Sequence, residues 1–214
     1  MKPTLAALAA ALLATGGLAG CASSSDSAPA TQSYVAQVQP MNTAVTRTAA
    51  TGTARFTVSG DRLTIDIDAQ GTPPNTVHWQ HFHGLTGPGG ARCATMAADA
   101  NHDGIVDLIE TGPASGTTMV PFTQDPASMD VAHGQYPSAG PDGRYHYHQV
   151  VSLKALDAAF AKAFPGQALD LDRRVVLIHG VPASTPLPPS VQSLGPIPAT
   201  TTLPIACGQI VRAG

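Results

Sequence analysis

The chain is poor in charged residues, and this shortage excludes one broad class of partner. Only 12% of its 214 residues are Asp, Glu, Lys or Arg, and the formal net charge is −3. A nucleic-acid-binding surface needs clustered Lys and Arg to neutralise phosphates. The longest basic run here is the pair Arg173 and Arg174. We therefore expect no nucleic-acid partner.

Long apolar runs are also scarce, and the clearest one lies at the start of the chain. Lys2 is followed by an apolar run at Leu5–Leu13 and then by small residues, which is typical of an export signal. The stretch "LAGC" at Leu18–Cys21 resembles the lipobox of bacterial lipoproteins, in which a peptidase cuts before the cysteine and its sulfur receives a lipid. The alternative is an ordinary secretory signal with a chance cysteine. No later run approaches the roughly 20 residues needed to span a bilayer.

The lipobox resemblance implies three segments and a location. Residues 1–20 are expected to be a lipoprotein signal peptide, and residues 21–50 the lipid-bearing Cys21 with a flexible tether. The tether is expected from the Ser/Ala/Pro-rich stretch "ASSSDSAPATQS". Residues 51–214 form one domain of ordinary size. We expect a protein of the bacterial cell envelope, held at the membrane by lipid and facing the periplasm.

Cysteine is rare, with three in the chain. If Cys21 carries lipid, Cys93 and Cys207 remain, so a single pairing is possible. Disulfides persist in exported proteins, which favours this bond. The alternative is two free thiols.

The domain pattern is mostly that of short strands. Residues 54–71, "ARFTVSGDRLTIDIDAQG", alternate apolar and polar positions around a turn at "SGD", which predicts a hairpin with one buried face. Further β-rich runs are expected at residues 77–85, 145–153, 173–181 and 203–211. One helix is expected in "SLKALDAAFAKAFPG", where apolar residues recur at helical spacing until Pro165 and Gly166. The pattern predicts an all-β sandwich or barrel with one inserted helix.

Histidines gather in the stretch "VHWQHFHGL", which holds His78, His81 and His83 of the eight in the chain. Residues two apart on a strand share a face, whereas residues three apart do not. His81 and His83 can therefore bind one metal ion, and His78 points to the other face. The alternative is that these histidines are hydrogen-bonded core residues.

A second motif, "DANHDGIVDLIE", fits the twelve-residue calcium loop of EF-hands. A hard cation needs six or more oxygen ligands, and Gly104 permits the sharp bend between them. The expected ligands are Asp99, Asn101, Asp103, the carbonyl of Ile105, Asp107 and Glu110. No full helix pair surrounds the motif, so we expect a solitary loop that stabilises an insertion. The alternative is an acidic turn without metal.

Several segments together resemble copper/zinc superoxide dismutases. "HWQHFH" has the His-x-x-His-x-His spacing of the family's copper strand, and Cys93 follows as its first disulfide cysteine does. "RRVVLIHG" is similar to the strand that carries the last copper histidine, and "IACGQIV" to the C-terminal strand with the second cysteine. The resemblance implies a Greek-key β-sandwich or barrel and a Cys93–Cys207 disulfide. It also implies copper ligands His81, His83 and His179, with His78 as a structural histidine.

Two departures from the family lower the expectation of catalysis. The family's bridging histidine and zinc ligands have no clear counterpart among the remaining histidines, which are His102, His133, His146 and His148. The arginine that attracts superoxide, three residues before the second cysteine, is replaced by Pro204. We therefore expect an envelope lipoprotein that binds calcium and copper without efficient catalysis. The alternatives are an active copper superoxide dismutase and a calcium-stabilised structural module without copper; a protein partner is not indicated.

Overall fold

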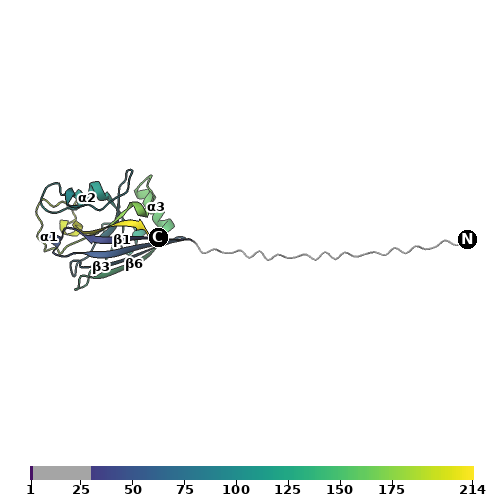
Figure 1. The fold of residues 1–214 in the computed structure, drawn as a ribbon, viewed down its shortest axis with the longest axis horizontal. Coiled ribbons are helices and arrows are strands. Elements are labelled where there is room, and N and C mark those ends of the chain that lie inside the picture. Colours follow the sequence, from purple (N-terminus) through teal and green to yellow (C-terminus); the bar gives the residue numbers. More distant parts are fainter. Residues whose placement is uncertain (2–29) are drawn as a thin grey trace.

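The computed structural model describes Met1 and residues 30–214, and Figure 1 shows a β-rich fold. Apart from Met1, the expected signal peptide lies outside the described residues, as does Cys21. Within the described residues, no helix is both long and apolar enough to cross a bilayer.

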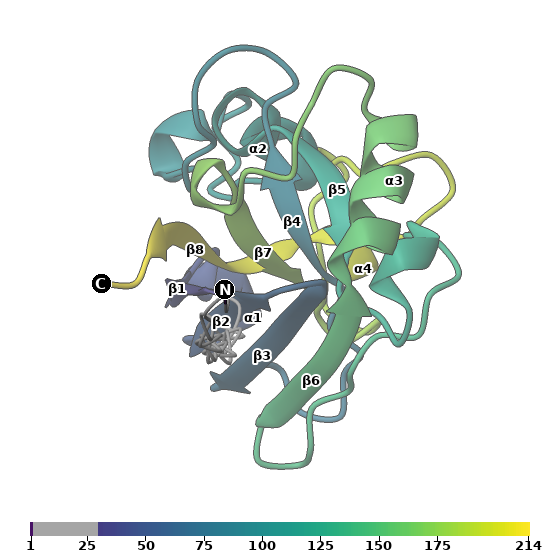
Figure 2. The same cartoon turned by 90° about the vertical axis from the view of Figure 1, so that its right-hand side faces the viewer.

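In the described residues, eight strands form one sheet in the order β5-β4-β7-β8-β1-β2-β3-β6, and every strand pair is antiparallel. The sheet curls into a half-barrel (Figure 2). The strands are β1 (Thr31–Pro40), β2 (Thr51–Ser59), β3 (Arg62–Gln70), β4 (Gln80–Gly84), β5 (Thr117–Pro121), β6 (Tyr145–Ser152), β7 (Val175–His179) and β8 (Pro204–Arg212). The all-β prediction is confirmed, and the arrangement is compatible with a superoxide-dismutase-like fold.

The helices are short. The α-helices of the described residues are α1 (Thr43–Thr46), α2 (Leu108–Ser115), α3 (Leu153–Ala163) and α4 (Ala199–Thr202), and the 3-10 turns are η1 (Met96–Ala98), η2 (Pro126–Ser128) and η3 (Leu171–Arg173). The predicted inserted helix is α3. Ser152 caps it by accepting a hydrogen bond from the Ala155 amide, and Leu156 and Phe160 are its buried residues. Helical spacing therefore identified the face that packs.

The strand alternation predicted for residues 54–71 is present as the β2–β3 hairpin, whose turn includes Gly60 in the left-handed region at φ 56°. Its apolar residues enter the core inside the half-barrel. There Phe56 lies 5.0 Å from Phe82 of β4, measured between ring centroids. Phe122 lies 4.7 Å from Phe82. The core therefore fixes the position of β4, the strand that carries two of the candidate ligands.

The folded part of the chain begins earlier than expected. The flexible tether is expected to extend to residue 50, but Thr31–Pro40 form β1, which pairs with β2 on one side and with β8 on the other. Tyr34, Ala36 and Val38 are buried. The expected domain start at residue 51 is therefore wrong. The inward residues of β1 alternate with Ser, Gln and Val, a composition that resembles a linker more than a core strand.

The disulfide between Cys93 and Cys207 is present, with a Cα–Cα distance of 5.7 Å and a sequence separation of 114 residues. Cys207 is buried beside Val175 and Leu177 of β7. The bond therefore ties the segment after β4 to the last strand.

Candidate metal centre

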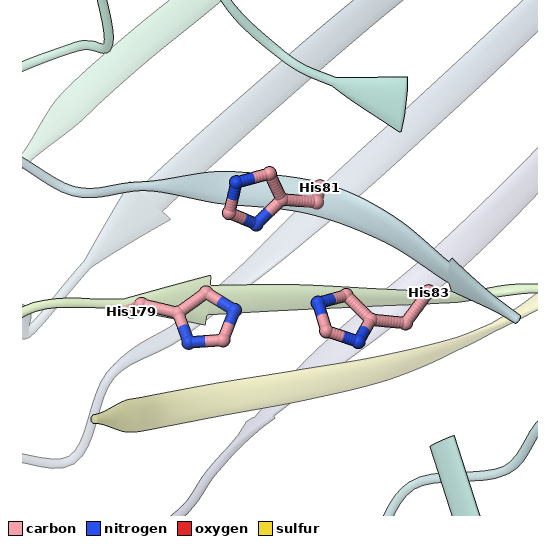
Figure 3. Close-up of side chains that lie close together, drawn as sticks. All are labelled: His81, His83 and His179. Atoms are coloured by element: carbon pink, nitrogen blue, oxygen red, sulfur yellow. The ribbon is translucent and has the colours of Figure 1, made fainter. Parts of the chain in front are cut away.

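Three buried histidines meet on the face of the sheet opposite the core. His81 and His83 come from β4, and His179 ends the neighbouring strand β7. Phe82, between the first two, points into the core, as the two-residue period of a strand requires. One ligand atom from each histidine lies within 4.8 Å of the other two, and Figure 3 shows the rings turned toward a common point.

The ring-centroid distances are 5.8 Å between His81 and His83, 5.3 Å between His81 and His179, and 5.5 Å between His83 and His179. The pairing of β4 with β5 is irregular between His81 and His83. The structure thus brings together the three residues that the sequence proposed as copper ligands.

Each histidine of the cluster has one ring nitrogen hydrogen-bonded to a residue outside the cluster. His179 Nδ1 lies 2.8 Å from the Thr202 carbonyl, which can only accept, so Nδ1 carries the proton. The Tyr136 hydroxyl donates to the Val131 carbonyl at 2.9 Å, so it accepts from His81 Nε2, also at 2.9 Å. The unprotonated ring nitrogen is therefore Nε2 in His179 and Nδ1 in His81.

The third ring has one nitrogen engaged as well: His83 Nε2 lies 3.1 Å from the Thr118 hydroxyl, which can donate or accept. The nitrogens that remain are Nδ1 of His81, Nδ1 of His83 and Nε2 of His179, and all three are buried without a hydrogen-bond partner. Leaving a buried polar atom unpaired costs about 1–3 kcal/mol. Three such atoms in one cluster form a donor set that a metal ion satisfies.

The surroundings keep these imidazoles neutral. Burial lowers the pKa of His83 to about 3 and that of His179 to about 4. Burial, followed by the proximity of His179 and His83, lowers the pKa of His81 well below its ordinary value. Neutral imidazole is the form that coordinates metal. The cluster is therefore in its ligating form at neutral pH.

His78 lies outside this cluster, as the strand geometry predicted. Its ring is buried and stacks on Tyr145 at 5.6 Å between centroids. Its Nδ1 lies 3.1 Å from the His179 carbonyl and its Nε2 3.2 Å from the Pro73 carbonyl. His78 thus contacts the backbone of a candidate ligand while its own nitrogens are engaged.

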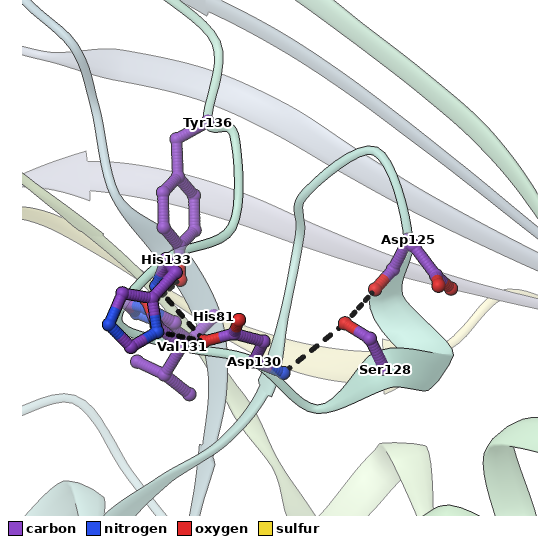
Figure 4. Close-up of polar contacts among 7 residues, drawn as sticks. All are labelled: His81, Asp125, Ser128, Asp130, Val131, His133 and Tyr136. Atoms are coloured by element: carbon purple, nitrogen blue, oxygen red, sulfur yellow. Dashed lines mark hydrogen bonds and ion pairs between the residues drawn. The ribbon is translucent and has the colours of Figure 1, made fainter.

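Apolar side chains cover the cluster. A cavity of about 30 Å³ beside His81 and His179 is lined by Trp79, Leu108, Thr118, Val131, Leu194, Ile197 and Thr202. Such a volume holds about one water molecule. Tyr136 stacks on Trp79 at 5.1 Å between centroids. Figure 4 shows Tyr136 beside His81, with the Asp130–His133 pair in the same loop.

The expected calcium loop lies between η1 and α2. Gly104 has φ 85°, as the sharp bend requires. Asp107 caps α2, and Glu110 completes a capping box with it. The acidic oxygens mostly accept hydrogen bonds from amides of the loop itself: Asp99 from Asp103 and Gly104, Asn101 from Asp103, Asp103 from Ile105, and Glu110 from Ala100 and Asn101. Within residues 30–214, no three acidic side chains of this loop bring their ligand atoms within 4.8 Å of one another.

Sequence reasoning missed the residues that hydrogen-bond the outer ring nitrogens, namely Thr118, Tyr136 and Thr202. They lie on an edge strand, in a loop and in a four-residue helix, where no periodic pattern marks them. The remaining histidines do not join the buried cluster: His102 lies in the acidic loop, His133 pairs with Asp130, and His146 and His148 lie on β6.

Comparison of the sequence with protein-family models and with curated proteins gave no match.

Proposed function

We propose that this chain is a metal-binding lipoprotein of the bacterial envelope, with a superoxide-dismutase-like domain that holds copper through His81, His83 and His179. The observation that carries the proposal is that three buried histidines each offer a ligand atom within 4.8 Å of the other two, and each also has one buried ring nitrogen without a hydrogen-bond partner. A core of packed histidines would pair these nitrogens with carbonyls or hydroxyls, as His78 does.

Copper is the ion that this donor set favours. Imidazole suits copper, zinc, nickel and iron, and Cu²⁺ binds most tightly among the divalent first-row ions. The sequence resemblance to the copper strand of superoxide dismutases points to the same ion. When bound, copper would supply a redox-active centre; the protein supplies three neutral nitrogens and an apolar cover.

That cover argues against efficient dismutation. A dismutase needs an open coordination position and a cationic approach that raises the encounter rate of the anion. A surface hollow of about 580 Å³ borders His83, yet its described lining carries no Lys or Arg. The imidazole of His83 is itself fully buried. Pro204 stands where the family has its arginine.

The test is copper analysis of the purified chain beside His179→Ala, followed by a superoxide-consumption assay. We expect one tightly held copper ion that His179→Ala loses, with little turnover. Equal copper in both proteins would leave the histidines as core residues. Rapid turnover by the copper-loaded wild type would identify an enzyme instead.

Calcium binding is the second part of the proposal, and the spacing of the acidic motif supports it. The loop also contacts the segment that covers the histidines: Ser190 donates to Asp103 at 2.5 Å and the Gln192 amide donates to Asp107 at 2.7 Å. Calcium held by Asp99, Asn101, Asp103, Ile105, Asp107 and Glu110 would therefore stabilise that segment.

Thermal unfolding with added calcium or chelator tests the loop. Wild type should gain stability with free calcium because the ion binds the folded state. Glu110→Gln removes a charge and weakens the bidentate contact, so its unfolding midpoint should respond less. An identical response of both proteins would show that the loop is not a calcium site.

A further inference from the structure

A second group of candidate ligands lies on the exposed side of the sheet. His146 and His148 stand two residues apart on β6, an edge strand, and Asp66 and Asp68 stand two apart on β3. The register places His148 opposite Asp66 and His146 opposite Asp68. All four side chains therefore share one face of a two-stranded ribbon.

The contacts between the strands are close. His148 Nδ1 lies 2.6 Å from an Asp66 oxygen, and His146 Nδ1 lies 2.9 Å from an Asp68 oxygen. The two imidazoles stack with 6.5 Å between centroids and 16° between planes. One ligand atom from each of Asp66, His146 and His148 lies within 4.8 Å of the other two.

Neighbouring charges distinguish the two aspartates. Arg55 of β2 lies 3.8 Å from Asp68, so Asp68 has a cation beside it as well as a histidine. Asp66 pairs only with His148 among the salt-bridge partners in residues 30–214. Asp66 is therefore the carboxylate more available to a metal ion, and Asp68 is placed to orient His146.

Burial of the two neighbouring tyrosines on β6 keeps His146 and His148 on the exposed face of the sheet. Tyr145 and Tyr147 alternate with them and are buried, and the Tyr147 hydroxyl donates to the Thr123 carbonyl at 2.7 Å. The side chains of His146 and His148 are 58% and 53% exposed. An ion from solvent reaches them without a change in the fold.

We infer that Asp66, His146 and His148 form an exposed site for a divalent transition-metal ion such as Zn²⁺ or Cu²⁺, with Asp68 as a positioning residue. Two imidazoles and a carboxylate are a common donor set for such ions. A histidine ligand held by a carboxylate hydrogen bond is the usual outer-shell arrangement. Calcium does not fit, because it takes oxygen ligands. The inference is independent of copper in the buried cluster.

The experiment is carbethoxylation of the full chain by diethylpyrocarbonate, with and without Zn²⁺, and mass spectrometry of each histidine. His133 is the matched control, since it is exposed and pairs with Asp130 at 3.1 Å but belongs to neither group of potential metal ligands found in the described part of the chain. Zinc should protect His146 and His148 at concentrations that leave His133 reactive. Asp66→Asn should raise the zinc needed for half protection by at least about tenfold, because even outer-shell losses cost 10–100-fold.

Two results would overturn the inference. Equal labelling of His146 and His148 with and without zinc would make the residues ordinary cross-strand pairs. Protection of His133 at the same zinc concentration would mean nonspecific binding. If Asp66→Asn misfolds, His146→Gln serves in its place, with loss of zinc protection at His148 as the expected result. The buried histidines do not enter this measurement, so a failure of the copper proposal would leave it unchanged.

Discussion

Replacing His83 by Leu should separate metal binding from stability. The change removes a buried Nδ1 without a partner, which relieves about 1–3 kcal/mol, and removes the hydrogen bond to Thr118, which costs about 1 kcal/mol. The metal-free variant should therefore be as stable as wild type or more stable by up to about 2 kcal/mol. A residue retained for packing alone would give the opposite result.

Copper should reverse that order of stability. At free copper about 100 times the dissociation constant, wild type gains about 2.7 kcal/mol. If loss of one ligand weakens binding about 100-fold, His83→Leu gains about 0.4 kcal/mol at the same concentration. Urea denaturation with copper or chelator measures both values.

The matched control is Phe82→Leu, on the opposite face of the same strand. This change leaves space in the core and should cost on the order of 1–2 kcal/mol, while the copper-dependent gain stays at its wild-type value. All proteins should also carry His146→Asn and His148→Asn, so that the exposed cluster adds nothing. A destabilised His83→Leu that keeps the full copper response would refute the reasoning.

Two further predictions follow from the structure and one from the lipobox resemblance. The pKa of His83 lies at about 3 and that of His179 at about 4, below the ordinary 6.5, so the unfolded chain binds more protons below about pH 6.5. Urea denaturation of the metal-free protein should show stability falling from pH 6.5 toward 4, by up to about 1.4 kcal/mol per pH unit for each histidine; a flat profile would contradict neutral burial. Replacing Cys93 and Cys207 by Ala should lower the free energy of unfolding by roughly 4–5 kcal/mol, because on the chain-entropy model the bond closes a loop set by their separation of 114 residues. A loss below about 1 kcal/mol in urea denaturation would show that this loop is already constrained in the unfolded chain. Cys21→Ser should move the protein from the membrane to the soluble fraction, whereas continued membrane association would argue against a lipid anchor.

The sequence predicted the fold where alternation is strong and failed where it is weak. The β2–β3 hairpin and α3 have apolar residues at the period of their structure, so burial and secondary structure agree. In β1 the inward positions are Tyr34, Ala36 and Val38, and the segment around them is rich in Ser, Thr and Gln, which resembles a linker. The pairing of β1 with β8 comes from contacts across the whole chain, which a local pattern does not contain.

The candidate ligands illustrate the same limit at the level of single residues. The two-residue spacing of His81 and His83 places them on one face from local geometry alone. His179 joins them only because β7 pairs with β4, and it was named as a ligand from a family resemblance rather than from spacing. The exposed cluster required the register of β3 and β6, since neither Asp66 nor His148 forms a motif within its own strand.

The hydrogen bonds of the buried cluster come from strand β5, from a loop and from α4, as well as from the strands that carry the histidines. The strands place three imidazoles, and each imidazole has one ring nitrogen hydrogen-bonded to a residue outside the cluster. Those partners are Thr118, Tyr136 and Thr202. Thr202 follows the segment whose Gln192 amide bonds to Asp107 of the acidic loop. The acidic loop and the segment that precedes Thr202 are therefore joined by two hydrogen bonds, from Ser190 to Asp103 and from the Gln192 backbone amide to Asp107.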